Sequence, residues 1–493
     1  MHPTIVINVV GLTPRMLGAD TPVLQRLATS GAMRQIKSVF PAVTCPVQTT
    51  YLTGLLPREH GIVANGWYFR DLSEVLFWRQ SNRLVRGERV WEAARTRDPD
   101  FTCANMFWWY NMYSSADIGV TPRPLYLADG RKIPDCYTAP RELRDDLTQR
   151  FGRFPLFSFW GPATSIVASQ WITRSSLYIR REHKPALTLI YLPHLDYVLQ
   201  RDGPGAPNVA RDLKDVDELC GEIIDDARRD DARVIVLSEY GITPVSKPVD
   251  INRALRRAGL VAVREELGRE QLDPGASAAF AVADHQIAHV YVNDRNRLAE
   301  IRALITALPG IGYVLDDASK AEFGVDHARS GEFVAVADAN SWFTYYYWLD
   351  DAKAPDYART VDIHRKPGYD PVELFFDPAN RAPRLSVAYR LAKRTLGFRA
   401  LMDVIPLDAT LVKGSHGRPT DDAADGAVFI SSEAGLLSSD PVAATGVKAL
   451  ILRHLFDETQ RYARRRIDTK QDDQREKSGG AHGVLDEPVA HLS

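Results

Sequence analysis

The chain has 493 residues, of which 45% are hydrophobic and 25% are charged, and its formal net charge is −2. This composition is ordinary for a globular protein that is large enough for more than one lobe. The nearly balanced charge provides no global field to attract nucleic acid or an anionic membrane, and no apolar run approaches the ~20 residues of a membrane span.

Three apolar runs predict strands that are buried on both faces: Ile5–Val10, Leu187–Leu192 and Arg233–Leu237. Helical patterns follow the first run at Thr21–Ser30 and separate the other two at Val209–Arg228. Strands that alternate with helices predict an α/β fold, a doubly wound and mostly parallel sheet with helices on both faces. Functional sites of such sheets form at the carboxyl ends of the strands.

Two regions are expected to interrupt this core. Residues 65–165 are rich in aromatic residues and predict a cap or insert, and residues 295–405 predict a smaller α+β lobe. Both belong to a catalytic domain that we expect to span residues 1–460. The charged and polar segment 461–493 predicts a disordered tail.

The stretch Phe40–Ile62, FPAVTCPVQTTYLTGLLPREHGI, carries the first candidate for chemistry. Thr44 follows a strand end that is bounded by proline and precedes a segment that reads as the start of a helix. This geometry exposes a hydroxyl group to the partial positive charge of a helix N-terminus. A threonine hydroxyl is a poor nucleophile by itself, so it needs a nearby base or metal ion.

Three ionisable side chains are expected at the same edge of the sheet. Asp196 follows the strand LTLIYL, Glu239 follows RVIVL, and His416 lies in KGSHGRP. Carboxylate oxygens and a neutral imidazole can together hold a divalent cation, which would lower the pKa of the Thr44 hydroxyl. Each residue also has an ordinary interpretation, as a helix cap, a hydrogen-bonded loop residue or a turn threonine.

The order and spacing of these motifs resemble the alkaline phosphatase superfamily, in particular its nucleotide pyrophosphatase/phosphodiesterase branch. The matching blocks are Thr44 with TGLLP and HGIxxN, Asp196 with Gly203-Pro204, Ser238–Gly241, and Ser415–Gly417. The resemblance implies an α/β fold with a capping region, two zinc-type ions and a threonine that is transiently phosphorylated.

The metal ligands carry over incompletely. By resemblance Thr44 is the nucleophile. Asp196 and His416 match two ligands of one ion, and Gln200 stands in place of the third ligand of that ion. At the other ion, the aspartate of the first strand is replaced by Val10, and an Asp-His pair by Glu239 and Tyr240. The resemblance therefore implies zinc, and an oxygen-rich ligand set would shift the preference toward manganese or magnesium.

Other polar residues are candidates for replacement ligands or phosphate contacts. Some lie near the predicted strand ends and others in the runs ADHQ and VDIHRKPGYDP, where a local turn is the alternative interpretation. They are Asn8, His194, Asp284, His285, Asp362, His364 and Arg365.

The predicted function is a metal-dependent phosphoester hydrolase that acts on a small-molecule substrate, with no nucleic-acid partner and no membrane span. A catalytically silent relative that binds a phosphorylated ligand or partner is the main alternative. A phosphomutase or sulfatase-like enzyme is weaker, because Cys45-Pro46 lacks the arginine of the sulfatase signature. The four scattered cysteines and a start without a secretory pattern predict a cytoplasmic protein.

Overall fold

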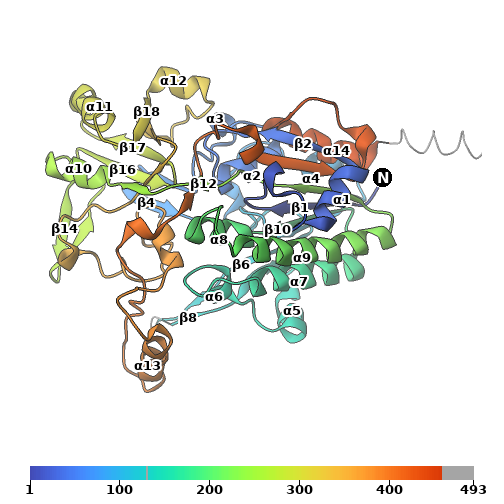
Figure 1. Ribbon diagram of the computed structural model, residues 1–493, viewed down its shortest axis with the longest axis horizontal. Helices are drawn as coiled ribbons and strands as arrows, with labels where there is room; N and C mark the ends of the chain where they lie inside the picture. The colour runs from blue at the N-terminus through green and yellow to red at the C-terminus, as the bar shows by residue number, and fades with distance from the viewer. Residues whose placement is uncertain (129–130, 458–493) are drawn as a thin grey trace, which may run out of the picture.

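The computed structural model describes residues 1–128 and 131–457, and a nine-stranded sheet forms its centre (Figure 1). The five strands from β11 to β6 are parallel, whereas β22 and β9 run antiparallel to their neighbours on that side. In spatial order the strands are β23 (Val442–Ala443), β2 (Ala32–Lys37), β22 (Ala427–Ser431), β11 (Arg233–Leu237), β1 (Thr4–Val9), β10 (Leu187–Leu192), β5 (Cys103–Met106), β6 (Ile118–Pro122) and β9 (Cys136–Ala139).

This sheet confirms the predicted fold class. The three central strands are the three apolar runs of the sequence, and each is buried along its whole length. A strand that is covered on both faces needs apolar side chains on both faces, which is why these runs do not alternate.

Helices cover both faces of the sheet (Figure 1). One layer contains α1 (Pro22–Ser30), α7 (Val167–His183) and α9 (Val209–Arg229). The other contains α2 (Thr44–Thr53), α4 (Val90–Arg97) and α14 (Val447–Phe456). The layers and the sheet share one apolar core, as expected for a doubly wound domain.

A smaller lobe has its own four-stranded antiparallel sheet and its own apolar core. Its strand order is β16 (Ala279–Asp284), β17 (Ile287–Val292), β19 (Phe333–Ala337) and β18 (Ile311–Leu315). The helices of this lobe are α10 (Ile251–Arg257), α11 (Leu298–Thr306) and α12 (Asp317–Glu322). α11 and β19 lie within residues 295–405, where the sequence predicts an α+β lobe.

The boundaries of the interrupting regions differ from those expected. β5, β6 and β9 lie within residues 65–165 but belong to the main sheet, so this region is not a separate cap. The hairpin of β3 (Gly66–Phe69) and β4 (Glu74–Phe77) packs against β16 of the smaller lobe. That lobe starts before residue 295, because its first two strands precede it. The predicted tail 461–493 lies outside the described residues, and the division into domains stays a prediction.

The remaining helices and strands are short connections or lie at the edges, apart from α13, which projects from the body (Figure 1). The remaining elements are α3 (Pro57–His60), α5 (Leu143–Phe151), α6 (Leu156–Phe159), α8 (His194–Asp202), α13 (Pro383–Thr395), and the paired strands β7 (Leu125–Tyr126) with β8 (Lys132–Ile133), β12 (Thr243–Pro244) with β21 (Gly414–Ser415), β13 (Lys247–Val249) with β20 (Ser341–Phe343), and β14 (Val263–Glu266) with β15 (Arg269–Leu272).

Within the part of the chain that the structure describes, no helix combines the length and apolar character needed to cross a bilayer.

Candidate active site

Thr44 is the first residue of α2, as the sequence predicts. Val43 before it is extended, and the helix then runs buried to Gly54, which ends it in the left-handed conformation that glycine adopts without strain. The Thr44 side chain therefore lies at the positive end of the helix dipole. It is 4% exposed, so its chemistry takes place in a largely enclosed space.

A tyrosine connects Thr44 to the first carboxyl group of the site. The Tyr240 hydroxyl lies 2.9 Å from Thr44 Oγ1 and donates to Asp196 Oδ1 at 3.2 Å. Gln200, one turn farther along α8, donates to Asp196 Oδ2 at 2.8 Å. The phenol of Tyr369 in turn donates to Gln200 Oε1 at 2.9 Å. This chain of hydrogen bonds fixes the orientation of Asp196 beside the threonine.

Two amide groups hold the second carboxyl group. Asn8 of β1 and Gln48 of α2 each donate to Glu239 Oε1 at 2.6 Å. The backbone N–H of Trp109 donates to Gln48 Oε1 at 2.7 Å and so sets the direction of the amide. The other oxygen, Glu239 Oε2, is buried and has no hydrogen-bond partner among the described residues.

Four aromatic rings form a stack along one side of the site. Tyr240 stacks on His416 and His285 stacks on Tyr369, each at 3.6 Å between ring centroids, and the two histidine rings lie 3.8 Å apart with a tilt of 38°. His285 Nδ1 lies 2.7 Å from Asp284 Oδ1, and both residues are buried. The stack brings His285 of the smaller lobe against His416 of the main domain.

Asp284 is also connected to the start of α2. Asn65 donates to it from its backbone N–H at 2.8 Å and from Nδ2 at 3.1 Å. The carboxamide oxygen of Asn65 accepts from the Cys45 N–H at 2.9 Å. The Cys45 N–H is the first backbone donor after Thr44, and this hydrogen bond occupies it.

Burial dominates the electrostatics of the site. It raises the pKa of Asp196 to about 7 and that of Glu239 to about 8, although hydrogen bonds to each carboxyl oppose the shift. The pKa of Asp284 is raised to about 6 for the same reason. Burial lowers the pKa of His285 and His416 well below the usual value. No Lys or Arg among the described residues forms an ion pair with any of the three carboxyl groups.

The half of the site around Asp196 suits one divalent ion. His416 Nδ1 lies 2.8 Å from the carbonyl oxygen of Ala42, so it carries the proton and donates it there. The lone pair is then on Nε2, which is buried, has no described partner, and lies 3.7 Å from Asp196 Oδ1. A lone pair that faces a carboxylate oxygen is repulsive unless a cation or proton lies between them. Neutral imidazole and carboxylate are ordinary ligands of zinc and related ions.

The half around Glu239 does not suit an ion. Val10 offers no donor atom, and the amides of Asn8 and Gln48 direct their N–H groups at the carboxyl where a metal would bind. Within residues 1–128 and 131–457, no three His, Cys, Asp or Glu side chains are arranged to hold a metal together. The two-ion centre that the resemblance implies therefore does not fit these residues.

Several predicted residues lie elsewhere. His194 pairs with Asp212 of α9 at 2.7 Å instead of facing Thr44. The Asp362 backbone N–H donates to Glu373 Oε1, and His364 contacts the carbonyl of Phe77. Arg365 forms an exposed ion pair with Asp356. The structure thus unites Thr44 with Asn8, Asp196, Gln200, Glu239, Asp284, His285 and His416, and leaves Asp362, His364, Arg365 and His194 outside this network.

Three residues of the network were not predicted from the sequence. Gln48 had a signal, because it lies one helical turn after Thr44 and so shares its face of α2. Tyr369 lies in the VDIHRKPGYDP run, but its partner Gln200 is distant in the sequence. Tyr240 was interpreted as a lost ligand, and nothing local indicates that its hydroxyl reaches Thr44.

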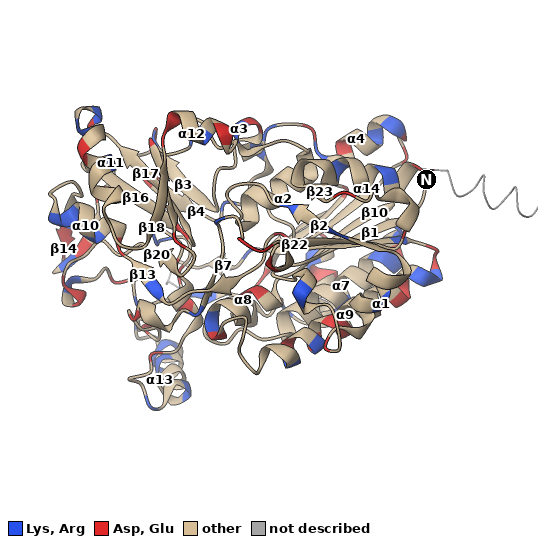
Figure 2. Ribbon diagram, turned by 45° about the horizontal axis from the view of Figure 1, so that its top comes forward, with Lys and Arg blue, Asp and Glu red and all other residues tan. Residues whose placement is uncertain are grey.

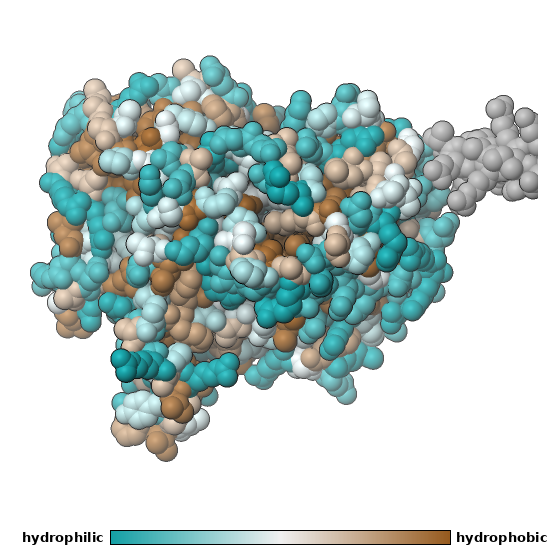
Figure 3. Space-filling model, viewed as in Figure 1, coloured by the Kyte–Doolittle hydropathy of each residue, from teal (hydrophilic) through white to brown (hydrophobic). Residues whose placement is uncertain are grey.

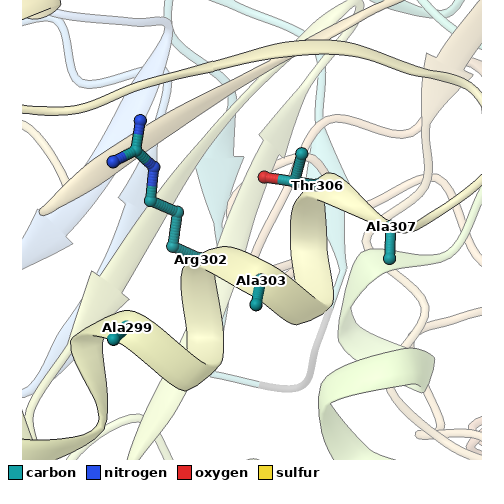
Figure 4. Close-up of a pocket in the computed structure, with 5 residues that line it drawn as sticks. All are labelled: Ala299, Arg302, Ala303, Thr306 and Ala307. Carbon is teal, nitrogen blue, oxygen red and sulfur yellow. The ribbon is translucent and has the colours of Figure 1, made fainter.

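A hollow on the outer side of α11 is a separate feature (Figure 4). It lies in the smaller lobe and contains no carboxyl, imidazole or thiol group, so it is not a candidate for catalysis. Its lining consists of Ala299, Arg302, Ala303, Thr306 and Ala307.

Comparison with known families bears on this geometry. Residues 4–370 match the family model of type I phosphodiesterase / nucleotide pyrophosphatase, which covers most of the chain. The chain belongs to this family. The match confirms the resemblance to the nucleotide pyrophosphatase/phosphodiesterase branch, whose members hydrolyse phosphoester bonds and generally depend on metal ions.

Individual relatives are distant. An uncharacterized pyrophosphatase/phosphodiesterase of Schizosaccharomyces pombe is 25% identical over 218 residues, which is 42% of this chain and 37% of the relative. The chain thus matches well under half the length of this curated relative.

Solved structures show the same fold at low identity. Murine ectonucleotide pyrophosphatase / phosphodiesterase 5, as an inactive variant in complex with AMP, has a TM-score of 0.57 and 15% identity, covering 92% of this chain and 95% of the other. Phosphonoacetate hydrolase from Sinorhizobium meliloti, in complex with phosphonoformate, has a TM-score of 0.58 and 15% identity, with coverages of 92% and 96%.

Proposed function

We propose that the protein is a phosphoester hydrolase in which Thr44 attacks the phosphorus atom and is transiently phosphorylated. The observation that carries this proposal is the hydrogen bond between Thr44 Oγ1 and the Tyr240 hydroxyl, which includes the threonine in the network of Asp196. The complexes of the murine relative with AMP and of the bacterial hydrolase with phosphonoformate support a small substrate with a phosphoryl or phosphonyl group.

Glu239 is the base in this proposal. Its Oε2 has no described partner, Thr44 is near enough to lower the pKa of the carboxyl, and that pKa of about 8 is close to the working range of a general base. As Thr44 Oγ1 forms its bond to phosphorus, its proton passes to Glu239 and the bond to the leaving oxygen breaks; the departing alkoxide takes a proton from water and leaves as the alcohol. A water molecule then hydrolyses the phosphothreonine and frees Thr44.

One divalent ion would be held by Asp196 and His416. When bound, it would offset the negative charge of a phosphoryl group, as Lewis acids do. Gln200 and Tyr240 position Asp196 for this task through the hydrogen bonds described above. Zinc is implied by the family, and manganese or magnesium is the alternative.

The test is hydrolysis of a chromogenic phosphodiester, such as bis(p-nitrophenyl) phosphate, with and without added zinc, manganese or magnesium. We expect a rate that depends on one of these ions, and a loss of about 10³-fold or more in Thr44→Ala. Thr44→Ser keeps a hydroxyl group and is the matched control. Equal inactivity of the wild type and Thr44→Ala with all three ions would contradict the proposal.

A catalytically silent relative remains the second candidate, because every member of the network is almost fully buried and amide donors face Glu239. Metal analysis of the purified protein separates the two, since the hydrolase requires about one equivalent of ion. The predicted cytoplasmic location stays a prediction, in keeping with four free cysteines.

A further inference from the structure

The segment of residues 378–402, here called the basic arm, leaves the body of the protein and returns to it. The Asp377 N–H donates to the carbonyl of Val404 at 2.9 Å, which closes the base of the arm. Its only helix is α13, and no residue of α13 is buried. Figure 1 shows the helix projecting away from both lobes.

The apolar side chains of the arm face outward. Leu385, Tyr389 and Leu396 lie at helical spacing and are 73%, 60% and 75% exposed, so they form one stripe. Leu391 and Phe398 add further exposed apolar surface. Figure 3 shows brown, hydrophobic residues at the end of the projection. Isolated exposed apolar residues are normal, whereas a contiguous group usually marks an interaction surface.

Polar contacts lie on the inner side of the same helix. Arg390 forms an ion pair with Asp403 at 2.7 Å, and Arg394 donates to the carbonyl of Ala400 at 2.7 and 2.9 Å. These contacts hold the returning segment against α13. A helix of a soluble domain normally has the reverse arrangement, with the apolar face inward. Arginine side chains therefore hold the arm together, while its apolar side chains are largely exposed.

The charge of the arm has one sign, although the whole chain has a net charge of −2. Between residues 378 and 402 there is no Asp or Glu, and Figure 2 shows blue, basic positions along α13. Lys393 lies over the ring of Tyr389, with its Nζ 4.6 Å from the centroid. The basic residues are Arg381, Arg384, Arg390, Lys393, Arg394 and Arg399.

We propose that the basic arm docks the protein on the surface of an anionic lipid bilayer. The outward apolar stripe would enter the boundary between headgroups and acyl chains, while Arg384, Lys393 and Arg399 contact lipid phosphates. An amphipathic helix with basic flanks is the usual form of such an anchor, which lies on the membrane and does not span it. Among the described residues these three cations have no ion-pair partner. The net charge of −2 for the whole chain does not reveal the positive charge that is concentrated in the basic arm.

The proposal does not depend on the hydrolase activity. The arm lies outside the candidate site, because none of its residues is a member of the network around Thr44. Its test measures binding, and the outcome is independent of turnover.

The experiment is sedimentation of the full chain with sucrose-loaded vesicles of phosphatidylcholine alone or with 30% phosphatidylserine. We expect binding to the anionic vesicles at least tenfold stronger than to the neutral ones, and a steep loss in 0.5 M salt. Leu385→Gln/Leu396→Gln/Phe398→Gln should abolish binding. Arg384→Gln/Lys393→Gln/Arg399→Gln should weaken it about a hundredfold.

Leu267→Gln is the matched control, because Leu267 is a fully exposed leucine in the turn between β14 and β15, far along the chain from the arm. It should bind like the wild type, and unchanged thermal unfolding should show that all variants are folded. Equal absence of binding to both kinds of vesicle would overturn the proposal. So would a wild-type dimer that the variant Leu385→Gln/Leu396→Gln/Phe398→Gln converts to monomers, because these apolar side chains would then contact a second copy of the chain.

Discussion

The two carboxyl groups beside Thr44 are both buried, yet their surroundings differ. Asp196 faces the lone pair of a neutral imidazole, whereas Glu239 faces the N–H groups of two amides. Both carboxyl groups accept hydrogen bonds, Asp196 from Tyr240 and Gln200 and Glu239 from the two amides, but only Asp196 also lies near an unprotonated imidazole nitrogen. The difference is why we propose an ion only at Asp196 and His416, and none at Glu239.

The largest expected effect comes from the base. Glu239→Gln keeps the shape of the side chain but cannot accept the Thr44 proton, so kcat should fall by about 10²–10⁴-fold. In the wild type the rate should rise with pH toward a plateau above about pH 8, because the carboxyl must be ionised to act. The pH–rate profile of both proteins checks this. An unchanged profile in the variant would assign the base elsewhere.

The next-largest expected effect concerns the half of the site around Asp196 and His416. His416→Ala removes a proposed ligand and should reduce the affinity for a divalent ion by at least about 10–100-fold, as measured by titration calorimetry. Asn8→Ala serves as the control, since it alters only the half around Glu239. If both variants bound the ion like the wild type, the Asp196–His416 pair would not be its site.

Tyr240→Phe tests the connection between the two halves. It removes the hydroxyl that contacts both Thr44 and Asp196 and leaves the ring stacked on His416. We expect a loss of stability of about 1–2 kcal/mol from the broken hydrogen bonds, and a drop of roughly tenfold in kcat. Denaturant unfolding and steady-state kinetics measure the two effects separately. A rate equal to the wild type would show that the phenol has a structural role alone.

The smallest effect is the pH dependence of stability in protein stripped of metal. Asp196 and Glu239 have folded-state pKa values of about 7 and 8, above those of the unfolded chain. Between pH 6.5 and 8 the folded state therefore binds more protons, and its stability falls as the pH rises, by up to about 1.4 kcal/mol per unit and group. The buried histidines are neutral in both states over most of this window. Thermal unfolding in chelator should show the decline, and Asp196→Asn should flatten it.

Much of the fold followed from the sequence. The runs IVINVV, LTLIYL and RVIVL are continuously apolar, and the structure pairs them as the three central parallel strands. Thr44 was placed at a helix start, and Asp196 and Glu239 at strand ends, because chain order in an α/β sheet determines which loops share an edge. In the aromatic region 65–165, no local pattern indicated that the short strands β5, β6 and β9 would extend the main sheet.

The amino-acid sequence by itself determined the family, the place of Thr44 at a helix start, and the presence of Val10 where the resemblance implies a metal ligand, because these depend on residue type and spacing along the chain. Tertiary structure decided the rest. Gln48 and Asn8 bind Glu239, and Tyr240 bridges Thr44 and Asp196. Asp362, His364 and Arg365 lie apart from them. These arrangements depend on the directions of side chains from segments that are far apart in the sequence. Such directions are fixed by packing, which no local pattern records.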